Sequence, residues 1–185
     1  MVNMPKSPRI VVGVTGRIGS GKTSLARALE QDLGFQYVRY SQVLADWFKA
    51  DSSDKIRLQR IGGDVMTGAG QRELNRLLIS KIEATGDVVV DGLRHPIDFE
   101  SLHSYFGRQF FLIYVDVPAL IRFNRLSSRF ASIEEFKMAD ARPVESNIDS
   151  LRSMASVILP GTMLQDAFTS KSKSLVPGFR EKVVG

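Results

Sequence analysis

Residues 16–23 read Gly16-Arg17-Ile18-Gly19-Ser20-Gly21-Lys22-Thr23, which fits the pattern G-x-x-x-x-G-K-[ST] at every position. The glycines of this pattern let the backbone bend sharply and approach a phosphate closely. The N–H groups of such a loop surround an anion at the positive end of the following helix. The lysine reaches the β- and γ-phosphates, and the threonine hydroxyl ligates Mg²⁺. The motif therefore predicts that all eight residues bind a nucleoside triphosphate, expected to be ATP with Mg²⁺, and that Thr23 is a metal ligand.

The residues on either side of this loop support the interpretation. Residues 9–15 form an apolar, mostly β-branched stretch, which is typical of a buried parallel strand. Residues 24–33 carry leucine and alanine at helical spacing, and Gly34 stands where such a helix would end. Residues 9–34 therefore have the order strand, loop, helix that the motif requires, and a glycine-rich turn of another α/β protein is the weaker alternative.

Length and composition restrict the class of protein. We expect the 185 residues to fold as a single domain over residues 1–185. The hydrophobic content of 43% is ordinary for a globular protein, and no apolar run is long enough to span a membrane. The chain has no cysteine and no apolar signal-peptide centre, so we expect a cytoplasmic location. The net charge is +5, but the arginines are scattered, so nucleic-acid binding is not expected.

The rest of the chain alternates between predicted strands and helices. Besides residues 9–15, we expect strands over residues 35–40, 87–92, 109–116 and 156–159. We expect helices over residues 24–33, 42–49, 55–61, 71–84, 96–105, 118–128 and 143–154, a less regular segment over 130–141, and a last helix beginning at 163–168. Ser41 is the expected N-cap of the second helix, and glycines at 62–63 and 68–70 enclose a break. This order predicts an α/β fold of three layers, with a parallel five-stranded sheet covered by helices on both faces.

Two aspartates compete for the role of metal ligand. Ligands of parallel sheets bind beyond the carboxyl ends of the strands, and both Asp91 and Asp116 follow apolar strands at that edge. We prefer Asp91 because Arg94 follows it closely, and a carboxylate for the metal pairs sensibly with a guanidinium for a phosphate. The alternative role for Asp116 is to cap the helix that begins near Pro118.

Four arginines lie between residues 122 and 142, inclusive. Arg125 and Arg129 are four residues apart on one predicted helix and so share a face, with Arg122 before them and Arg142 behind them. Such a row is usually a solvated helix face. Here it favours a lid over residues 125–142 that closes on the triphosphate, adds positive charge around the transferring phosphoryl group and excludes water.

Taken together, these segments resemble those of the P-loop nucleoside and nucleotide kinases, the group that contains adenylate kinase, dephospho-CoA kinase and deoxynucleoside monophosphate kinases. The resemblance covers residues 9–160 and rests on residues 16–23, 40–44, 89–94 and 115–118 and on the two arginines that follow. It implies that the catalytic residues are Lys22, Asp91, Arg94, Arg125 and Arg129. It also implies that Thr23 and Asp91 hold Mg²⁺ and that Arg94 serves the acceptor phosphate.

The acceptor side, which we assign to residues 41–70, departs from the family pattern. Several relatives carry an arginine near the positions of Asp46 and Trp47, and this chain has none there. Arg57 and Arg60 are candidates to replace it, or the acceptor is unusual. The donor side is therefore the better supported of the two.

The sequence as a whole predicts a small-molecule kinase. It would transfer the γ-phosphoryl group of ATP to a small phosphorylated, nucleotide-like acceptor, either a nucleoside monophosphate or a molecule like dephospho-CoA. No membrane partner is expected. The alternative is a P-loop ATPase or switch that acts with a protein or RNA partner, and a further possibility is a P-loop domain cut from a longer chain.

Overall fold

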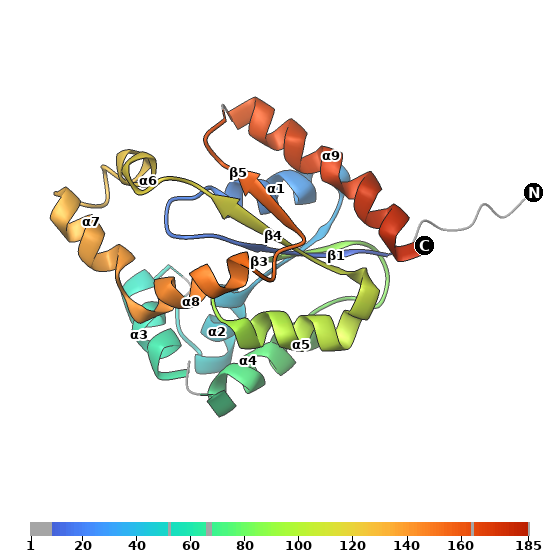
Figure 1. Ribbon diagram of the computed structural model, residues 1–185. Coiled ribbons are helices and arrows are strands. Elements are labelled where there is room, and N and C mark those ends of the chain that lie inside the picture. The colour runs from blue at the N-terminus through green and yellow to red at the C-terminus, as the bar shows by residue number, and fades with distance from the viewer. Residues whose placement is uncertain (1–8, 52, 66–67, 164, 185) are drawn as a thin grey trace, which may run out of the picture.

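A sheet of five parallel strands forms the centre of the computed structural model, which describes residues 9–51, 53–65, 68–163 and 165–184. Its strands are β1 (Val11–Thr15), β2 (Gln36–Arg39), β3 (Val88–Asp91), β4 (Phe110–Asp116) and β5 (Val157–Pro160). They lie in the order β2-β3-β1-β4-β5, with helices on both faces (Figure 1). The predicted three-layer α/β fold with a parallel five-stranded sheet is therefore confirmed.

Helices lie between successive strands, because parallel strands need a crossover, and a last helix follows β5. They are α1 (Lys22–Leu33), α2 (Tyr40–Phe48), α3 (Lys55–Val65), α4 (Gly68–Ser80), α5 (Pro96–Phe106), the 3₁₀ helix η1 (Gly107–Gln109), α6 (Ala119–Arg125), α7 (Ile133–Asp140), α8 (Pro143–Arg152) and α9 (Gln165–Val184). Gly34 ends α1 in the left-handed conformation, as predicted. Within the described ranges, no helix is both long and apolar enough to cross a membrane.

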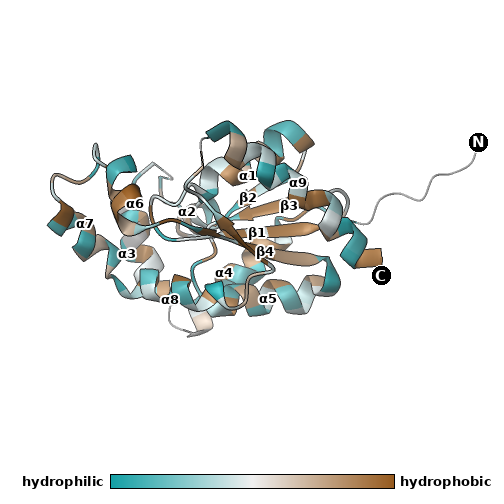
Figure 2. Cartoon of the chain, turned by 45° about the horizontal axis from the view of Figure 1, so that its top comes forward, coloured by the Kyte–Doolittle hydropathy of each residue, from teal (hydrophilic) through white to brown (hydrophobic). Residues whose placement is uncertain are grey.

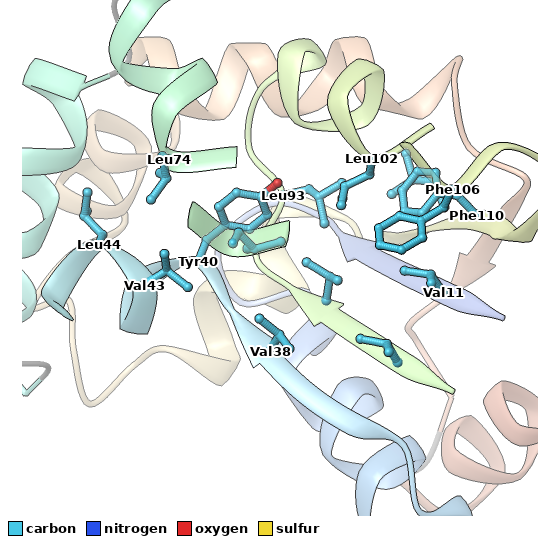
Figure 3. Packing of buried hydrophobic residues seen from close by; sticks show 14 of the residues in the cluster. Val11, Val38, Tyr40, Val43, Leu44, Leu74, Leu93, Leu102, Phe106 and Phe110 are labelled. Carbon is cyan, nitrogen blue, oxygen red and sulfur yellow. The ribbon is translucent and has the colours of Figure 1, made fainter. Parts of the chain in front are cut away.

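Two hydrophobic clusters hold the three layers together. On one face, α2, α4, α5 and α8 pack on the sheet around side chains such as Tyr40 and Leu102 (Figure 3). On the other face, α1 and α9 pack around Leu29, and the rings of Phe111 and Phe179 stack 4.4 Å apart. The apolar sheet is enclosed between helices whose outer surfaces are mostly polar (Figure 2). Each fully buried leucine stabilises the fold by about 2 kcal/mol.

The strand register brings the predicted site residues to one edge of the sheet. β1 lies between β3 and β4, and Asp91 at the end of β3 is opposite Val14 of β1 and Arg39 of β2. Thr15, the last residue of β1, is opposite Tyr114 of β4. The loop after β1 and the ends of β3 and β4 therefore meet where ligands of parallel sheets bind.

Two predictions about α2 and α3 are wrong. α2 begins at Tyr40, with Arg39 at the N-cap position, so Ser41 lies inside the first turn and does not cap the helix. α3 continues through the glycines at 62–63 to Val65, so its predicted end at residue 61 is wrong, whereas residues 66–67 of the predicted break lie outside the described residues. Val65 beyond the two glycines is buried in the core, so tertiary packing outweighs the low helix propensity of glycine.

Other helix boundaries also differ from the prediction. The segment 130–141, expected to be less regular, contains α7. This helix is capped by the Ser132 side chain, which accepts a hydrogen bond from the backbone N–H of Glu135 over 3.1 Å. α6 ends at Arg125, earlier than the predicted residue 128, and α4 is shifted toward the N-terminus relative to residues 71–84.

Candidate active site

The P-loop joins the end of β1 to the start of α1. α1 begins at Lys22, and Gly21 occupies its N-cap position. Gly16, Gly19 and Gly21 have φ values of 148°, 79° and 94°, which side-chain-bearing residues rarely adopt. A Cβ atom on Gly16 would lie 2.6 Å from the backbone oxygen of Val115, so this position has no room for a side chain. The loop therefore bends around the N-terminus of α1, where backbone N–H groups can bind phosphate.

The Lys22 ammonium lies among charges of both signs. Burial, together with the nearby guanidinium of Arg94, lowers the pKa of Lys22 to about 8. The carboxylates of Asp91 and Glu145 act in the opposite direction. The Nζ atom is 3.5 Å from the carbonyl oxygen of Arg17, which is long for a hydrogen bond. A bound anion would therefore stabilise the charged form of Lys22.

Thr23 and Asp91 meet beside the P-loop. The Thr23 Oγ1 hydroxyl donates to Asp91 Oδ2 over 2.9 Å. Asp91 is 1% exposed, and its Oδ1 atom is buried with no hydrogen-bond partner in the described part of the chain. A buried polar atom without a partner is costly, and hydroxyl and carboxylate oxygens are ligands that Mg²⁺ prefers.

These two residues therefore fit a magnesium ion. Among the described residues there is no group of three or more His, Cys, Asp or Glu side chains that could hold a metal. Magnesium commonly binds through one or two protein oxygens, and phosphate oxygens and water complete its six ligands. The donor set of Thr23 and Asp91 suits this mode.

Asp116 lies at the same edge, but its side chain has another partner. It is 46% exposed and forms an ion pair with Arg152 of α8 over 3.1 Å. α6 has Pro118 at its N-cap position and no side-chain cap, so the expectation that Asp116 caps this helix is wrong. The helix begins at Ala119, which leaves Asp116 two residues before the cap position.

β2 supplies two residues near Asp91 that the sequence motifs do not indicate. The Tyr37 hydroxyl donates to Asp91 Oδ2 over 2.7 Å, and Arg39 Nε lies 3.7 Å from the same oxygen. The guanidinium of Arg27 lies 3.8 Å from the centre of the Tyr37 ring. Burial and the charge of Asp91 raise the pKa of Tyr37 well above its usual range, so the hydroxyl keeps its proton. The sequence shows that Tyr37 and Arg39 are two residues apart and so share a face of the strand. That this face lies beside Asp91 follows only once β3 is known to be the neighbour of β2.

Two acids of α8 hold the P-loop. Glu145 and Asp149 are four residues apart and share a face of the helix. Glu145 accepts a hydrogen bond from the backbone N–H of Ile18 over 3.0 Å and pairs with Arg94 at 3.2 Å. Asp149 binds the Arg17 guanidinium through both oxygens, at 2.8 and 2.5 Å, which lowers the pKa of Asp149. The side chain of Arg17 is thus engaged with α8, and it also pairs with Asp140 of α7 at 3.1 Å.

The arginines of the predicted row lie in separate environments. Arg122 is buried, binds both oxygens of Asp140 at 2.6 and 2.8 Å, and so ties α6 to α7. Arg125 reaches the P-loop: its Nη2 donates to the Gly161 carbonyl over 2.5 Å, and its Nη1 lies 3.3 Å from the Ser20 carbonyl. Arg142 stands at the N-cap position of α8.

Arg125 and Arg129 do not share a helix face, so that prediction is wrong. α6 ends at Arg125, and the chain then turns over residues 126–129. The turn buries Phe130 against Phe136 of α7, and this packing ends the helix. Arg129 remains exposed, with its guanidinium 5.5 Å from the centre of the Phe130 ring.

The segment expected to be a lid has a small hydrophobic cluster of its own. Its buried members Phe130, Phe136 and Ala139 pack against Ile18, Phe123 and Leu126. Ile18 belongs to the P-loop, so α6 and α7 contact the loop directly through this cluster. Any movement of residues 125–142 would therefore change the packing of the P-loop.

A buried polar network lies behind the β3–α5 connection that carries Arg94. Asp98 Oδ1 accepts hydrogen bonds from Gln71 over 2.5 Å and from Asn75 over 2.9 Å. Its Oδ2 accepts from the backbone N–H groups of Arg94 and His95, over 2.9 and 3.0 Å. Burial raises the pKa of Asp98, and these hydrogen bonds offset part of that effect. The network holds the backbone from which the Arg94 side chain extends.

The structure also shows which arginines are accessible on this side. Arg39 and Arg94, with 45% and 39% of their side chains exposed, lie beside Asp91 and Glu145 at the sheet edge. Arg57 and Arg60 are exposed on α3. That α3 takes part in acceptor binding remains a prediction.

Fold and P-loop together define the class: the chain has the fold of the P-loop kinases. It resembles the shikimate kinase from Bacteroides thetaiotaomicron, with a TM-score of 0.68 and 14% identity over 91% of this chain and 98% of that one. It is also similar to a gluconokinase from Sinorhizobium meliloti 1021, with a TM-score of 0.69 and 11% identity over 97% of this chain and 98% of that one. At these identities the likeness concerns the fold.

Within this class, the chain belongs to the AAA_18 family, described as an AAA domain, which matches residues 12–142. Curated relatives include a UPF0200 protein from Pyrobaculum aerophilum, 28% identical over 155 residues, or 80% of this chain and 86% of the relative. A UPF0200 protein from Aeropyrum pernix is 25% identical over 169 residues, or 86% of this chain and 88% of the relative.

Proposed function

We propose that this protein is an ATP-dependent kinase that transfers the γ-phosphoryl group to a small, nucleotide-like acceptor. One observation carries the proposal: the contact between Thr23 and Asp91 beside a complete P-loop, with Asp91 Oδ1 buried and without a partner among the described residues. This arrangement suits a bound Mg-triphosphate at the carboxyl edge of the sheet. A cytoplasmic location would supply both ATP and Mg²⁺.

On the donor side, each residue has a distinct task. The backbone of residues 16–21 binds the phosphates, and Lys22 neutralises charge on the β- and γ-phosphates. Thr23 and Asp91 would hold Mg²⁺, which supplies positive charge to the phosphate oxygens when bound. Arg125, already beside the P-loop, and Arg129 would add positive charge as residues 125–142 close.

On the acceptor side, Arg94 and Arg39 favour an anionic acceptor. Both guanidinium groups are partly exposed at the edge that carries Asp91. An acceptor phosphate is already anionic and needs no general base, whereas a hydroxyl acceptor would need one, and Asp91 could serve. Catalysis would then depend chiefly on alignment of the two phosphates and on charge neutralisation.

The experiment is a measurement of ATP turnover with Mg²⁺ across nucleoside monophosphates, deoxynucleotides, dephospho-CoA, shikimate and gluconate, with products separated by chromatography. We expect one phosphorylated product, whose formation at subsaturating acceptor falls about tenfold in Arg94→Ala. A thermal-shift screen of the same compounds with Mg-ATP identifies which of them binds.

A second candidate is a P-loop ATPase or switch that acts with a protein or RNA partner. Arg57 and Arg60 favour this second candidate, because both are exposed on α3 and their exposure does not require that a small acceptor binds them. Slow ATP hydrolysis that no small acceptor changes, but that a protein or RNA partner raises, would support the switch and contradict the kinase.

A further inference from the structure

Strand β2 and helix α1 together surround one oxygen of Asp91. Tyr37 and Arg39 are two residues apart on β2, so their side chains lie on the same face of the sheet. The register places Arg39 opposite Asp91 and Tyr37 opposite Val89, the residue two positions before Asp91. α1 covers this face and brings Thr23 to the same carboxylate.

The contacts with this carboxylate are strongly asymmetric. Oδ2 accepts hydrogen bonds from Thr23 over 2.9 Å and from Tyr37 over 2.7 Å, and Arg39 Nε lies 3.7 Å away. Oδ1 is buried and has no hydrogen-bond partner in the described ranges. The donors thus occupy Oδ2, whereas the lone pairs of Oδ1 remain available to a cation. Thr23 can donate its proton to Oδ2 and keep its lone pairs for a metal.

The Tyr37 side chain is itself held in place. Its ring is half-buried against the hydrophobic cluster under α1, with the Arg27 guanidinium 3.8 Å from the ring centre. The hydroxyl therefore projects toward Asp91 from a packed ring. A hydrogen bond from a fixed donor restricts rotation of the carboxylate, as residues behind a metal ligand commonly do.

We infer that Tyr37 is a positioning residue for the metal site: its hydroxyl holds Asp91 Oδ2 and so keeps Oδ1 directed toward the bound divalent cation. This inference rests on the proposed function, in which Asp91 is a magnesium ligand. Tyr37 itself touches neither nucleotide nor metal in this arrangement.

The test is Mn²⁺ binding to the full chain in the presence of a non-hydrolysable ATP analogue, titrated by electron paramagnetic resonance. The variant Tyr37→Phe removes the hydroxyl and keeps the ring under Arg27. We expect Mn²⁺ affinity to fall about tenfold. The affinity for the analogue without metal should stay within twofold of wild type, because the P-loop is unchanged.

The matched control is Tyr114→Phe. Tyr114, on β4, also places its hydroxyl near a carboxylate, 3.4 Å from Asp149, but this acid is not a proposed metal ligand. Tyr114→Phe should bind Mn²⁺ as wild type does. Melting temperatures of both variants without ligands show whether either change acts through stability alone.

The outcomes separate this inference from the proposed function. Unchanged Mn²⁺ affinity in Tyr37→Phe, with wild type binding Mn²⁺ normally, overturns the role of Tyr37 and leaves the kinase proposal standing. Equal losses of affinity in Tyr37→Phe and Tyr114→Phe also overturn it. If wild type binds no Mn²⁺ with the analogue, the magnesium site and the role of Tyr37 fail together.

Discussion

The proposed donor side and the proposed acceptor side of this molecule are built in different ways. The donor side is a run of neighbouring residues, 16–23, between β1 and α1, completed by Asp91 from the adjacent strand. The proposed acceptor side would depend on segments far apart in the chain: α3, and the β3–α5 connection that carries Arg94 and is held by Asp98 of α5 and Gln71 of α4. A phosphate needs the same backbone cradle in every protein that uses this loop, whereas each acceptor needs its own pocket. The donor side can therefore be recognised locally, and the acceptor side cannot.

The largest expected effect tests the donor side. Lys22→Ala should lower kcat/KM by about 100- to 1000-fold, because it removes a positive charge from the transferring phosphates. The melting temperature of the ligand-free protein should not fall, since burial disfavours the charged form of Lys22. Turnover is measured as ADP release. Lys81→Ala, on the surface, is the control, and equal activity of Lys22→Ala and wild type would contradict the assignment.

The next comparison lies within the metal edge. Asp91→Asn should lower Mg²⁺-dependent turnover by about 100-fold, because the neutral amide holds a divalent cation poorly. Asp116→Asn should change it by less than about threefold, since its exposed carboxylate pairs with Arg152. Titration of activity with Mg²⁺ compares the two variants. The wrong strand has been chosen if Asp116→Asn is the variant that abolishes the Mg²⁺ dependence.

A smaller effect is expected on the acceptor side. Arg94→Met should raise the KM for the acceptor about tenfold and leave the affinity for ATP nearly unchanged, because it removes one charge-assisted hydrogen bond. The double variant with Glu145→Gln removes the unpaired acid that Arg94→Met leaves behind. Arg108→Met, at an exposed position of η1 before the start of β4 and therefore at the opposite end of the sheet, is the control. Weaker ATP binding with an unaltered acceptor KM would place Arg94 on the donor side instead.

The smallest effects concern stability, where α8 meets the P-loop. Glu145→Ala should lower the free energy of unfolding by about 1–3 kcal/mol, since it leaves Arg94 and the Ile18 N–H group without their partner. Asp149→Ala should cost about 1 kcal/mol or less, because its side chain is 51% exposed. Urea unfolding of both variants measures the difference. A larger loss in Asp149→Ala than in Glu145→Ala would reverse this ranking.

The Asp149 pair also has a predictable dependence on pH. Arg17 lowers the pKa of Asp149 in the folded protein, so the unfolded chain binds its proton more readily. The stabilisation is present above the ordinary aspartate pKa of 3.8 and is lost as the pH falls through the lower folded value. Asp149→Asn should lack this part of the acid dependence. Identical acid unfolding curves of wild type and Asp149→Asn would show that the pair does not contribute.

The prediction from sequence succeeds where a local pattern carries the information. The strand, loop and helix over residues 9–34 are confirmed, because glycine spacing and apolar periodicity depend on neighbours in the chain. The prediction fails at the glycines at 62–63, where burial of Val65 keeps α3 intact. It fails again at Arg129, where burial of Phe130 ends α6 early. Such packing depends on residues elsewhere in the fold.

By itself, the sequence determined the three-layer α/β fold and the P-loop, because hydrophobic periodicity and the glycine positions encode both over short distances. It also narrowed the metal ligand to two aspartates. Only the tertiary structure decided which of them contacts Thr23, and that Tyr37, Arg39 and the acids of α8 stand around the same site. The physical reason is that strand order and register bring together side chains that are distant in the chain. Neither the order nor the register can be predicted from the sequence of one strand alone.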